Sequence, residues 1–268
     1  MNIRISSIKN ELIKDIVNIQ TKSKVRKSRN ITIVEGLKEV DIAARVGTEF
    51  EKVLFCPQII SEADVLSVIG KHNSNVSLFE LTEEVFSKIS YRESTGGLVC
   101  MAKTIKTALK DLKVEDNSVF IVLESVEKPG NLGAVCRIAD AAKVNGIIIC
   151  DPLSDIYNPN TVRASLGCVF SVNIVGSDTD NVIKWLKDNN IQSYAAELNA
   201  SEFYHQTTLT GKTALIFGTE ATGLTNRWLD EADFRIKIPM SGNIDSLNVS
   251  VSVAIIVFEA MRQRDFLV

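Results

Sequence analysis

The spacing of apolar residues along this chain switches repeatedly between the helical and the extended period, which predicts an α/β protein. Near the start, apolar residues recur at the spacing of one helical face: Ile8, Leu12, Ile16 and Ile19. Short apolar runs follow at 31–34, 53–56, 76–79 and 98–102, with helical stretches near 36–46, 61–71 and 82–90. We expect residues 1–102 to form one compact α/β domain, since about 100 residues is a common domain size.

The pattern becomes more regular after residues 103–117, which are charged, lack a strong period and are interpreted as a linker. Apolar strands are expected at 118–124, 146–150, 171–175, 191–196, 213–217 and 234–238. Helices are expected at 132–143, 158–166, 179–189, 223–230 and 246–264. Strands that are apolar throughout and alternate with helices indicate a parallel sheet covered on both faces. Residues 118–268 are therefore expected to form a second domain.

The last expected helix, from Leu247 to Met261, is apolar on nearly every side. A helix with this pattern must be buried against more than one surface. A second copy of the chain is the obvious source of the additional surface, so we expect a homodimer.

Composition is ordinary for a soluble globular protein, with 45% hydrophobic and 24% charged residues. No apolar run approaches the roughly 18 residues that a membrane helix needs, so no membrane association is expected. The first residues, Met1–Ser6, lack the apolar segment of a secretory signal, which favours the cytoplasm.

The cysteines and histidines offer little material for a metal site. The cysteines are odd in number, form no C-x-x-C pair and are interpreted as reduced core residues: Cys56, Cys100, Cys136, Cys150 and Cys168. The two histidines, His72 and His205, are interpreted as solvated surface residues. We therefore expect no metal and no histidine acting as a general base.

Charge is unevenly distributed, although the whole chain carries only −3. Residues 1–30 contain eight basic and two acidic residues, whereas the rest of the chain contains 22 and 31. A basic segment on an acidic body is typical of a protein that holds an anionic partner in one place, and a phosphate backbone is the commonest such partner. The alternative is a solvated, lysine-rich helical face.

Three loops at expected strand ends carry glycines and polar residues, which predicts one crevice. In the first loop, after Pro129-Gly130, Asn131 is expected to cap a helix, with Arg137 under two turns further along. Backbone amides at a helix start attract anions, so this corner suits a phosphate or a ribose edge. The alternative is a capped helix with a surface arginine. A dinucleotide fingerprint is disfavoured because the G-x-G-x-x-G pattern is missing.

The second loop, Gly218–Leu224, and the third loop, Ile238–Val249, are expected to form a slot lined by main chain. Gly218 and Gly223 free the backbone for close contact with a flat ligand, and Glu220 supplies one acceptor. In the third loop, Pro239 holds the preceding residue extended, and Ser246 and Asn248 project from the start of the last helix. Such a slot suits an adenine, although each loop alone is also compatible with ordinary turn chemistry.

These three stretches resemble the three motifs of the SpoU/TrmH family of RNA ribose 2′-O-methyltransferases, within the SPOUT superfamily. The resemblance covers residues 118–268, and the third stretch, Ile-Pro-Met-Ser-Gly-Asn-Ile-Asp-Ser-Leu-Asn-Val from Ile238, follows the family pattern closely. The segment Asn158–Gly167 resembles the family's intermediate segment and adds Arg163 to the candidate RNA contacts. The first 100 residues resemble, less sharply, a small RNA-binding domain similar to ribosomal protein L30e.

The resemblance implies a homodimer, a trefoil knot in the C-terminal domain and bound S-adenosylmethionine. It implies that the methyl donor is lined by Gly218, Ile238 and Leu247, to which we add Gly223 and Met240 from the same loops. It implies a reaction centre made of Asn131, Arg137, Glu220, Ser246 and Asn248. The partner is RNA, with rRNA preferred and tRNA possible, and the basic segment is expected to grip it through Lys24, Arg26, Lys27 and Arg29.

The expected reaction is methyl transfer to a ribose 2′-hydroxyl. Because a guanidinium keeps its proton in proteins, we expect Arg137 to hold the ribose and the adjacent phosphate rather than to act as a base. The rival class is a non-catalytic RNA-binding or ribosome-assembly protein that has kept the fold. A nucleotide-dependent oxidoreductase is a weaker alternative.

Overall fold

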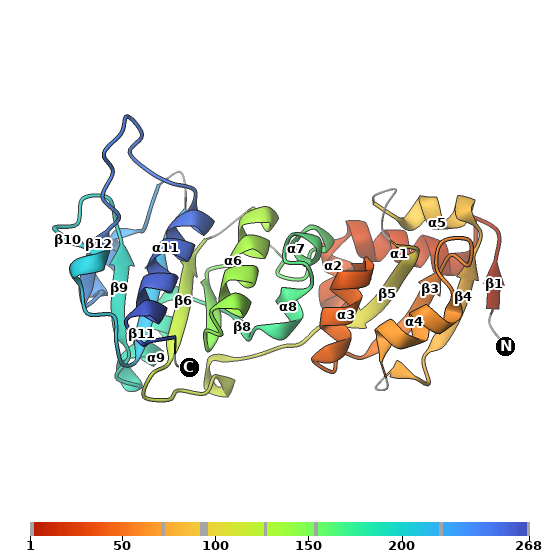
Figure 1. Ribbon diagram of the computed structural model, residues 1–268, viewed down its shortest axis with the longest axis horizontal. Helices are drawn as coiled ribbons and strands as arrows, with labels where there is room; N and C mark the ends of the chain where they lie inside the picture. The colour runs from red at the N-terminus through yellow and green to blue at the C-terminus, as the bar shows by residue number, and fades with distance from the viewer. Residues whose placement is uncertain are drawn as a thin grey trace. The chain divides into compact units, whose positions relative to one another are not determined.

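A computed structural model of the protein describes residues 3–70, 73–91, 96–125, 128–152, 155–219 and 222–266. The chain divides into two compact units. The first unit consists of Met1–Ile105 and Asp155–Ser171, and the second of Lys106–Ser154 and Val172–Val268 (Figure 1).

The first unit is built around a mixed sheet of five strands in the order β1-β4-β3-β5-β2. The strands are β1 (Ile3–Ile5), β2 (Ile31–Glu35), β3 (Phe50–Phe55), β4 (Ser77–Leu81) and β5 (Leu98–Lys103). Strand β5 runs antiparallel to both of its neighbours, β2 and β3, and the other pairs are parallel. The helices are α1 (Glu11–Thr21), α2 (Ser23–Arg29), α3 (Leu37–Arg45), α4 (Glu62–Ile69), α5 (Glu83–Ile89), α7 (Pro159–Ala164) and α8 (Cys168–Ser171).

Helix α1 shows how the apolar spacing at the start of the chain is used. Its buried stripe is Ile13, Ile16 and Ile19, at the three- and four-residue spacing of one helical face. The side chain of Asn10 caps the helix by accepting a hydrogen bond from the Leu12 amide at 2.8 Å. Ile16 and Ile19 are buried as expected, whereas Leu12 is only partly buried and Ile8 precedes the cap and is exposed.

The second unit contains a fully parallel sheet of seven strands in the order β10-β12-β9-β11-β6-β7-β8. The strands are β6 (Val119–Glu124), β7 (Gly146–Cys150), β8 (Ile174–Ser177), β9 (Gln192–Ala196), β10 (Glu202–Phe203), β11 (Thr213–Phe217) and β12 (Phe234–Lys237). The helices are α6 (Pro129–Ala141), α9 (Thr179–Asp188), α10 (Asn226–Glu231) and α11 (Val249–Arg262). The expected α/β class and parallel sheet are confirmed.

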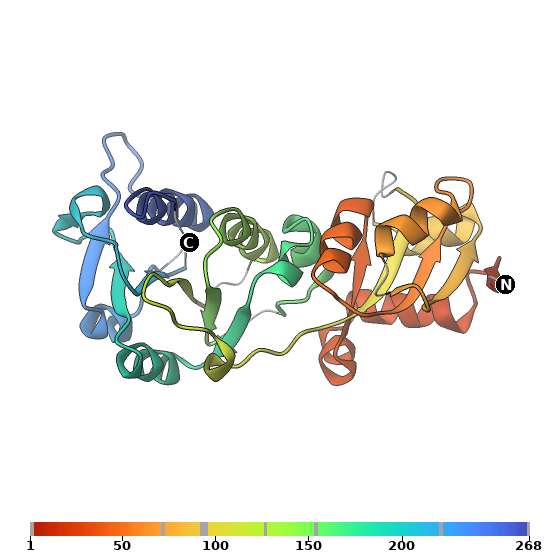
Figure 2. The ribbon, with the colours of Figure 1, turned by 60° about the horizontal axis from the view of Figure 1, so that its bottom comes forward.

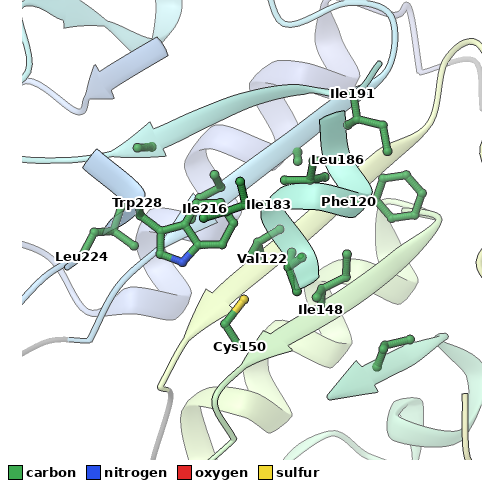
Figure 3. Close-up of a cluster of buried hydrophobic side chains, with 14 of the residues drawn as sticks. Phe120, Val122, Ile148, Cys150, Ile183, Leu186, Ile191, Ile216, Leu224 and Trp228 are labelled. Carbon is green, nitrogen blue, oxygen red and sulfur yellow. The ribbon is translucent and has the colours of Figure 1, made fainter. Parts of the chain in front are cut away.

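Helices cover both faces of this sheet, as the alternating side chains of its strands require. On one face, Phe120 and Val122 of β6 pack with Ile183 and Leu186 of α9, and Trp228 of α10 joins the same cluster (Figure 3). Helices α6 and α11 lie together on the opposite face (Figure 2).

Two boundaries in the structure differ from the expected ones. Helix α6 begins at Pro129 rather than after Asn131, because proline fits the first helical position, where its missing N–H has no partner to lose. The segment 155–171 packs with the first unit, although its sequence was assigned to the second domain. Its Asp155 carboxylate accepts a hydrogen bond from Arg26 at 2.6 Å, and the carbonyl of Tyr157 accepts one from the Thr32 hydroxyl at 2.7 Å.

Candidate functional site

A cavity of about 450 Å³ lies at the carboxyl ends of three neighbouring strands of the second unit, β12, β9 and β11. Its walls include the last residues of each strand and those that follow, namely 196–199, 217–219 and 236–238. The start of α11 supplies a further wall with Ser246, Leu247 and Val249. This is the edge at which open parallel sheets bind ligands, and the volume falls within the range of about 300–1,000 Å³ found for small-molecule sites.

All five residues expected to hold the cofactor lie in the wall of this one cavity: Gly218, Gly223, Ile238, Met240 and Leu247. They come from the second and third loops, which are separated in sequence and meet beside the strand ends. Their role in holding a cofactor stays a prediction.

The structure requires glycine at position 218 for a reason that differs from the expected one. A Cβ atom on Gly218 would lie 2.1 Å from the carbonyl carbon of Gly223 and 2.4 Å from the amide nitrogen of Leu224. The loop closes on itself because Thr219 and Gly223 exchange two backbone hydrogen bonds, of 3.1 and 3.0 Å. Gly218 therefore makes room for the loop itself, and the loop then forms the wall.

The cavity wall combines apolar side chains with a few polar ones. Leu224, Ile236 and Ile256 contribute apolar surface, whereas Glu197 and Asp245 add carboxylates and Lys237 adds an ammonium group. A mixed wall of this kind suits a ligand with a flat apolar ring and polar ends. The sequence analysis missed Glu197 and Lys237, although each is a charged residue at the end of an apolar strand.

The starts of α6 and α11 meet beside the cavity. Asn248 is the N-cap of α11 and accepts a hydrogen bond from the Ser250 amide at 2.9 Å. Its side-chain amide donates to the Oδ1 atom of Asn131, in the first turn of α6, at 3.2 Å. Two of the five expected reaction-centre residues, which lie 117 positions apart, are therefore in direct contact.

The other three expected reaction-centre residues are placed differently. Ser246 lies in the cavity wall and is exposed. Arg137 is exposed on α6, and within the described part of the chain it makes no ion pair. Its position follows Gly133 by four residues and Gly130 by seven, so it shares a helical face with two residues that have no side chain. Glu220 lies outside the described residues.

A buried carboxylate, missed by the sequence analysis, connects the first loop to the second. Glu124 ends β6 and is only 4% exposed. Its two oxygens accept hydrogen bonds from the amide of Thr225 at 2.8 Å and from the hydroxyl of Thr225 at 2.7 Å. Thr225 in turn precedes α10 as its N-cap residue. The signal in the sequence was a single acidic residue closing an otherwise apolar strand.

The basic residues expected to grip RNA divide into two groups. Lys24, Lys27 and Arg29 are exposed on α2, with Arg29 paired to Asp15 at 2.6 Å. For Arg26 the expectation of a surface contact was wrong. Arg26 is only 3% exposed, and its guanidinium pairs with Asp155 and donates a hydrogen bond to the carbonyl of Ile19 at 2.6 Å.

Arg163 is also held by neighbouring residues. Its guanidinium pairs with Glu35 at 3.2 Å and also bonds to Asn160. The centre of the same guanidinium lies 3.8 Å from the centroid of the Tyr91 ring. Arg163 therefore belongs to an organised cluster in the first unit rather than to a solvated surface.

All five cysteines are buried and unbridged, as expected of reduced core residues. Burial raises the pKa of the Cys150 thiol to about 12. Over the ranges that the structure describes, no helix is long and apolar enough to cross a membrane. His205 is exposed, and His72 lies outside the described residues.

The parallel seven-stranded sheet with a loop-lined cavity at its strand ends matches solved α/β methyltransferases of the SPOUT type. The chain belongs to the SpoU rRNA Methylase family, whose model matches residues 118–258. Residues 10–100 match the MRM3-like substrate binding domain.

Individual relatives agree with this assignment. The chain is 26% identical over 258 residues to the 23S rRNA (guanosine(2553)-2′-O)-methyltransferase RlmP of Bacillus subtilis. The alignment covers 95% of this chain and 98% of the relative. A crystal structure of an RNA 2′-O ribose methyltransferase matches with a TM-score of 0.85 and 33% identity, over 98% of this chain and 99% of the other. The AdoMet-bound rRNA methyltransferase of Sinorhizobium meliloti matches with a TM-score of 0.87 and 30% identity, over 97% of each chain.

Proposed function

We propose that this protein transfers a methyl group from S-adenosylmethionine to a ribose 2′-hydroxyl of ribosomal RNA. The observation that carries the proposal is the shared cavity of Gly218, Ile238 and Leu247, with the paired Asn131 and Asn248 beside it. The Bacillus subtilis relative is named as a 2′-O-methyltransferase of 23S rRNA and the Sinorhizobium meliloti structure as an rRNA methyltransferase, which supports rRNA over tRNA. We also propose a cytoplasmic location, which similarity to a bacterial rRNA-modifying enzyme supports.

The cavity fits the cofactor in size and chemistry. Apolar side chains such as Leu224 and Ile256 suit an adenine ring, and backbone groups of the second and third loops suit its edges. Glu197 and Asp245 supply acceptors for ribose hydroxyls or an ammonium group. When bound, S-adenosylmethionine supplies an electrophilic methyl group on a sulfonium.

The chain itself contributes mainly position. The N-terminal amides of α6 and the guanidinium of Arg137 would hold the target ribose and its phosphate. Arg137 would stabilise the alkoxide as the oxygen–carbon bond forms and the sulfur–carbon bond breaks, with the hydroxyl proton leaving to phosphate or water. Alignment of this kind lowers a barrier by about 7–11 kcal/mol, which makes positioning the dominant effect.

A methyl-transfer assay with 23S rRNA transcribed without modifications tests the proposal. Wild-type protein is expected to transfer labelled methyl groups to the rRNA, whereas Arg137→Ala loses activity by about a hundredfold or more and still binds S-adenosylhomocysteine. Arg137→Lys is expected to recover little activity, because an ammonium lacks the planar fork. Full activity of the lysine variant would refute the role given to Arg137.

Two further outcomes would redirect the proposal. Methylation of tRNA but not of rRNA would reassign the substrate. Calorimetry that finds no binding of S-adenosylhomocysteine would favour the rival class, a scaffold protein that has kept the fold. Mapping of 2′-O-methyl groups in rRNA from cells with and without this protein would identify the nucleotide.

We also propose a homodimer and a trefoil knot in the second unit. The dimer is supported by two apolar residues of α11, Val251, which is 44% exposed, and Phe258, which is 40% exposed. Because they are seven positions apart, they lie on the same face of the helix and form an exposed apolar surface. The knot is supported by the family alone. Phe258→Asp is expected to give monomers in light-scattering measurements at concentrations where the wild type is a dimer, because a charge on this face opposes its burial. A variant that stays dimeric would place the interface elsewhere.

A further inference from the structure

Tyr91 is an aromatic residue that the fold leaves in solvent. It lies two residues after the end of α5 and is 69% exposed, the highest exposed fraction among the large hydrophobic side chains of the described residues. One face of its ring is covered by the guanidinium of Arg163, whose central carbon lies 3.8 Å from the ring centroid. Because the residue is still 69% exposed, the opposite face of the ring is open to solvent. A flat aromatic surface is thus presented outward with its inner face already packed.

The position of this ring is fixed by one buried carboxylate. Glu35 is the last residue of β2, and its side chain is 2% exposed. One of its oxygens accepts a hydrogen bond from the backbone amide of Tyr91 at 2.6 Å. The other pairs with Arg163 at 3.2 Å, and the side chain of Arg163 is itself only 12% exposed. Glu35 therefore holds both the backbone beneath the ring and the cation that packs against it.

This arrangement is suited to a base and poorly suited to a phosphate. The positive charge of Arg163 is already matched by Glu35, so little charge is left to attract a phosphate. A rigid aromatic ring backed by a guanidinium is a surface on which an unpaired nucleobase stacks. Because Glu35 fixes the ring beforehand, little conformational entropy is lost when a base binds.

We propose that Tyr91, backed by Arg163 and fixed by Glu35, is a stacking platform for an unpaired nucleobase of the RNA substrate. The platform lies within the first unit, which contains the substrate-binding match, and none of its three residues lines the cavity of the second unit. The proposal rests on the proposed function only in requiring that the substrate be RNA.

The test compares RNA binding by the full-length wild type and variants with two fluorescent probes. One is a single-stranded RNA of about 12 nucleotides, and the other is the same strand in a duplex. Tyr91→Ala is expected to weaken binding of the single strand by about 5- to 150-fold and to leave duplex binding unchanged, since only unpaired bases can stack. Tyr91→Phe keeps the ring and is expected to bind as the wild type does.

Salt dependence separates stacking from charge. Tyr91→Ala is expected to leave the slope of log affinity against log salt unchanged, because no counterion is released by a stacked base. The matched control is Ile3→Ala, which removes an exposed apolar side chain at the opposite edge of the same sheet and should change neither probe. Circular dichroism and thermal melting verify that the variants are folded.

The outcomes distinguish the platform from the wider proposal. If the wild type binds and methylates 23S rRNA but Tyr91→Ala binds the single strand as tightly as the wild type, the platform is wrong and the proposed function stands. Equal weakening of both probes would also overturn the platform, because it indicates a phosphate contact or a structural defect. If the wild type binds neither RNA probe nor 23S rRNA, both proposals are wrong.

Discussion

Gly218 is the residue on which the shape of the cavity depends most directly. The space where its side chain would be is filled by the backbone of Gly223 and Leu224, so the second loop can close only with glycine there. Backbone atoms cannot move aside as the end of a flexible side chain can. A single added methyl group would therefore displace the wall formed by this loop.

Gly218→Ala is accordingly expected to abolish measurable S-adenosylhomocysteine binding in calorimetry. The same substitution at Gly130, on the exposed first turn of α6, meets no atom within 4 Å and is the matched control. We expect Gly130→Ala to bind S-adenosylhomocysteine within about twofold of the wild type, because an unhindered helical alanine is tolerated or mildly stabilising. Normal binding by Gly218→Ala would mean that the loop can relax without affecting the cavity.

At the residue scale, the sequence revealed which positions matter better than it revealed why. The second and third loops were recognisable, and all five of their residues that were assigned to the cofactor do line one cavity. The burial of Arg26 was not recognisable, because it depends on Asp155, which lies 129 positions away. The partner of Glu124 was hidden for the same reason, since Thr225 is 101 positions distant.

The helices that border the site are placed by their first turns. Asn248 has two tasks, capping α11 through Ser250 and donating a hydrogen bond to Asn131 of α6. The cap stabilises the helix, whereas the second bond fixes the start of α11 against the start of α6. A substitution that keeps one task and removes the other can separate stability from activity.

Asn248→Asp is expected to keep the cap and lose the donated bond. Its melting temperature should match the wild type, because aspartate and asparagine cap equally well, while kcat falls roughly ten- to a hundredfold from misplacement of Asn131. Asn248→Ala removes both and should also lose about 1 kcal/mol of stability. The control is Asn10→Asp, which alters the equivalent cap of α1 in the first unit. An Asn248→Asp enzyme with wild-type kcat would show that the Asn131 bond is dispensable.

At the element scale, the apolar runs were a good guide to strands and a weaker one to short elements. Each expected strand and helix corresponds to an observed one, with ends shifted by a few residues. The two-residue strand β10 and the four-residue helix α8 were missed, because so short a segment has no period to detect. Helix α2 was missed because its sequence, Ser-Lys-Val-Arg-Lys-Ser-Arg, has too few apolar residues to show a stripe.

The whole molecule has a net charge of −3, and its first 30 residues are the part in which basic residues outnumber acidic ones. Of the residues expected to bind phosphate there, Lys24 and Lys27 are exposed on α2, whereas Arg26 is buried. The electrostatic contribution to RNA binding should therefore come from the exposed lysines. This contribution differs from stacking because it depends on ionic strength.

The double variant Lys24→Ala/Lys27→Ala is expected to bind 23S rRNA more weakly and to reduce the slope of log affinity against log salt by about 1.5. Fluorescence anisotropy at several salt concentrations measures this slope. The control is Lys103→Ala/Lys187→Ala, which removes the same charge from lysines already paired with Glu49 and Glu231. If both double variants reduce the slope equally, binding responds to net charge rather than to α2.

The fold of the second unit was predictable as a class, since alternating strands and helices restrict a chain to few arrangements. The division of the chain was less predictable. The family match runs without interruption through residues 118–258, yet Asp155–Ser171 packs with the first unit. Ion pairs and hydrogen bonds to Arg26, Thr32 and Glu35 hold that segment in the first unit, and the local sequence pattern does not predict these long-range contacts.

That packing has a consequence for any attempt to dissect the protein. A fragment starting near residue 106 would contain Asp155–Ser171 without Arg26, Glu35 and the surrounding surface that accommodate it. Such a truncation would leave Asp155 and Arg163 without the opposite charges they now face. A chimera that takes its first unit from a relative should therefore also take the relative's segment equivalent to Asp155–Ser171, so that the two contacting surfaces come from the same protein.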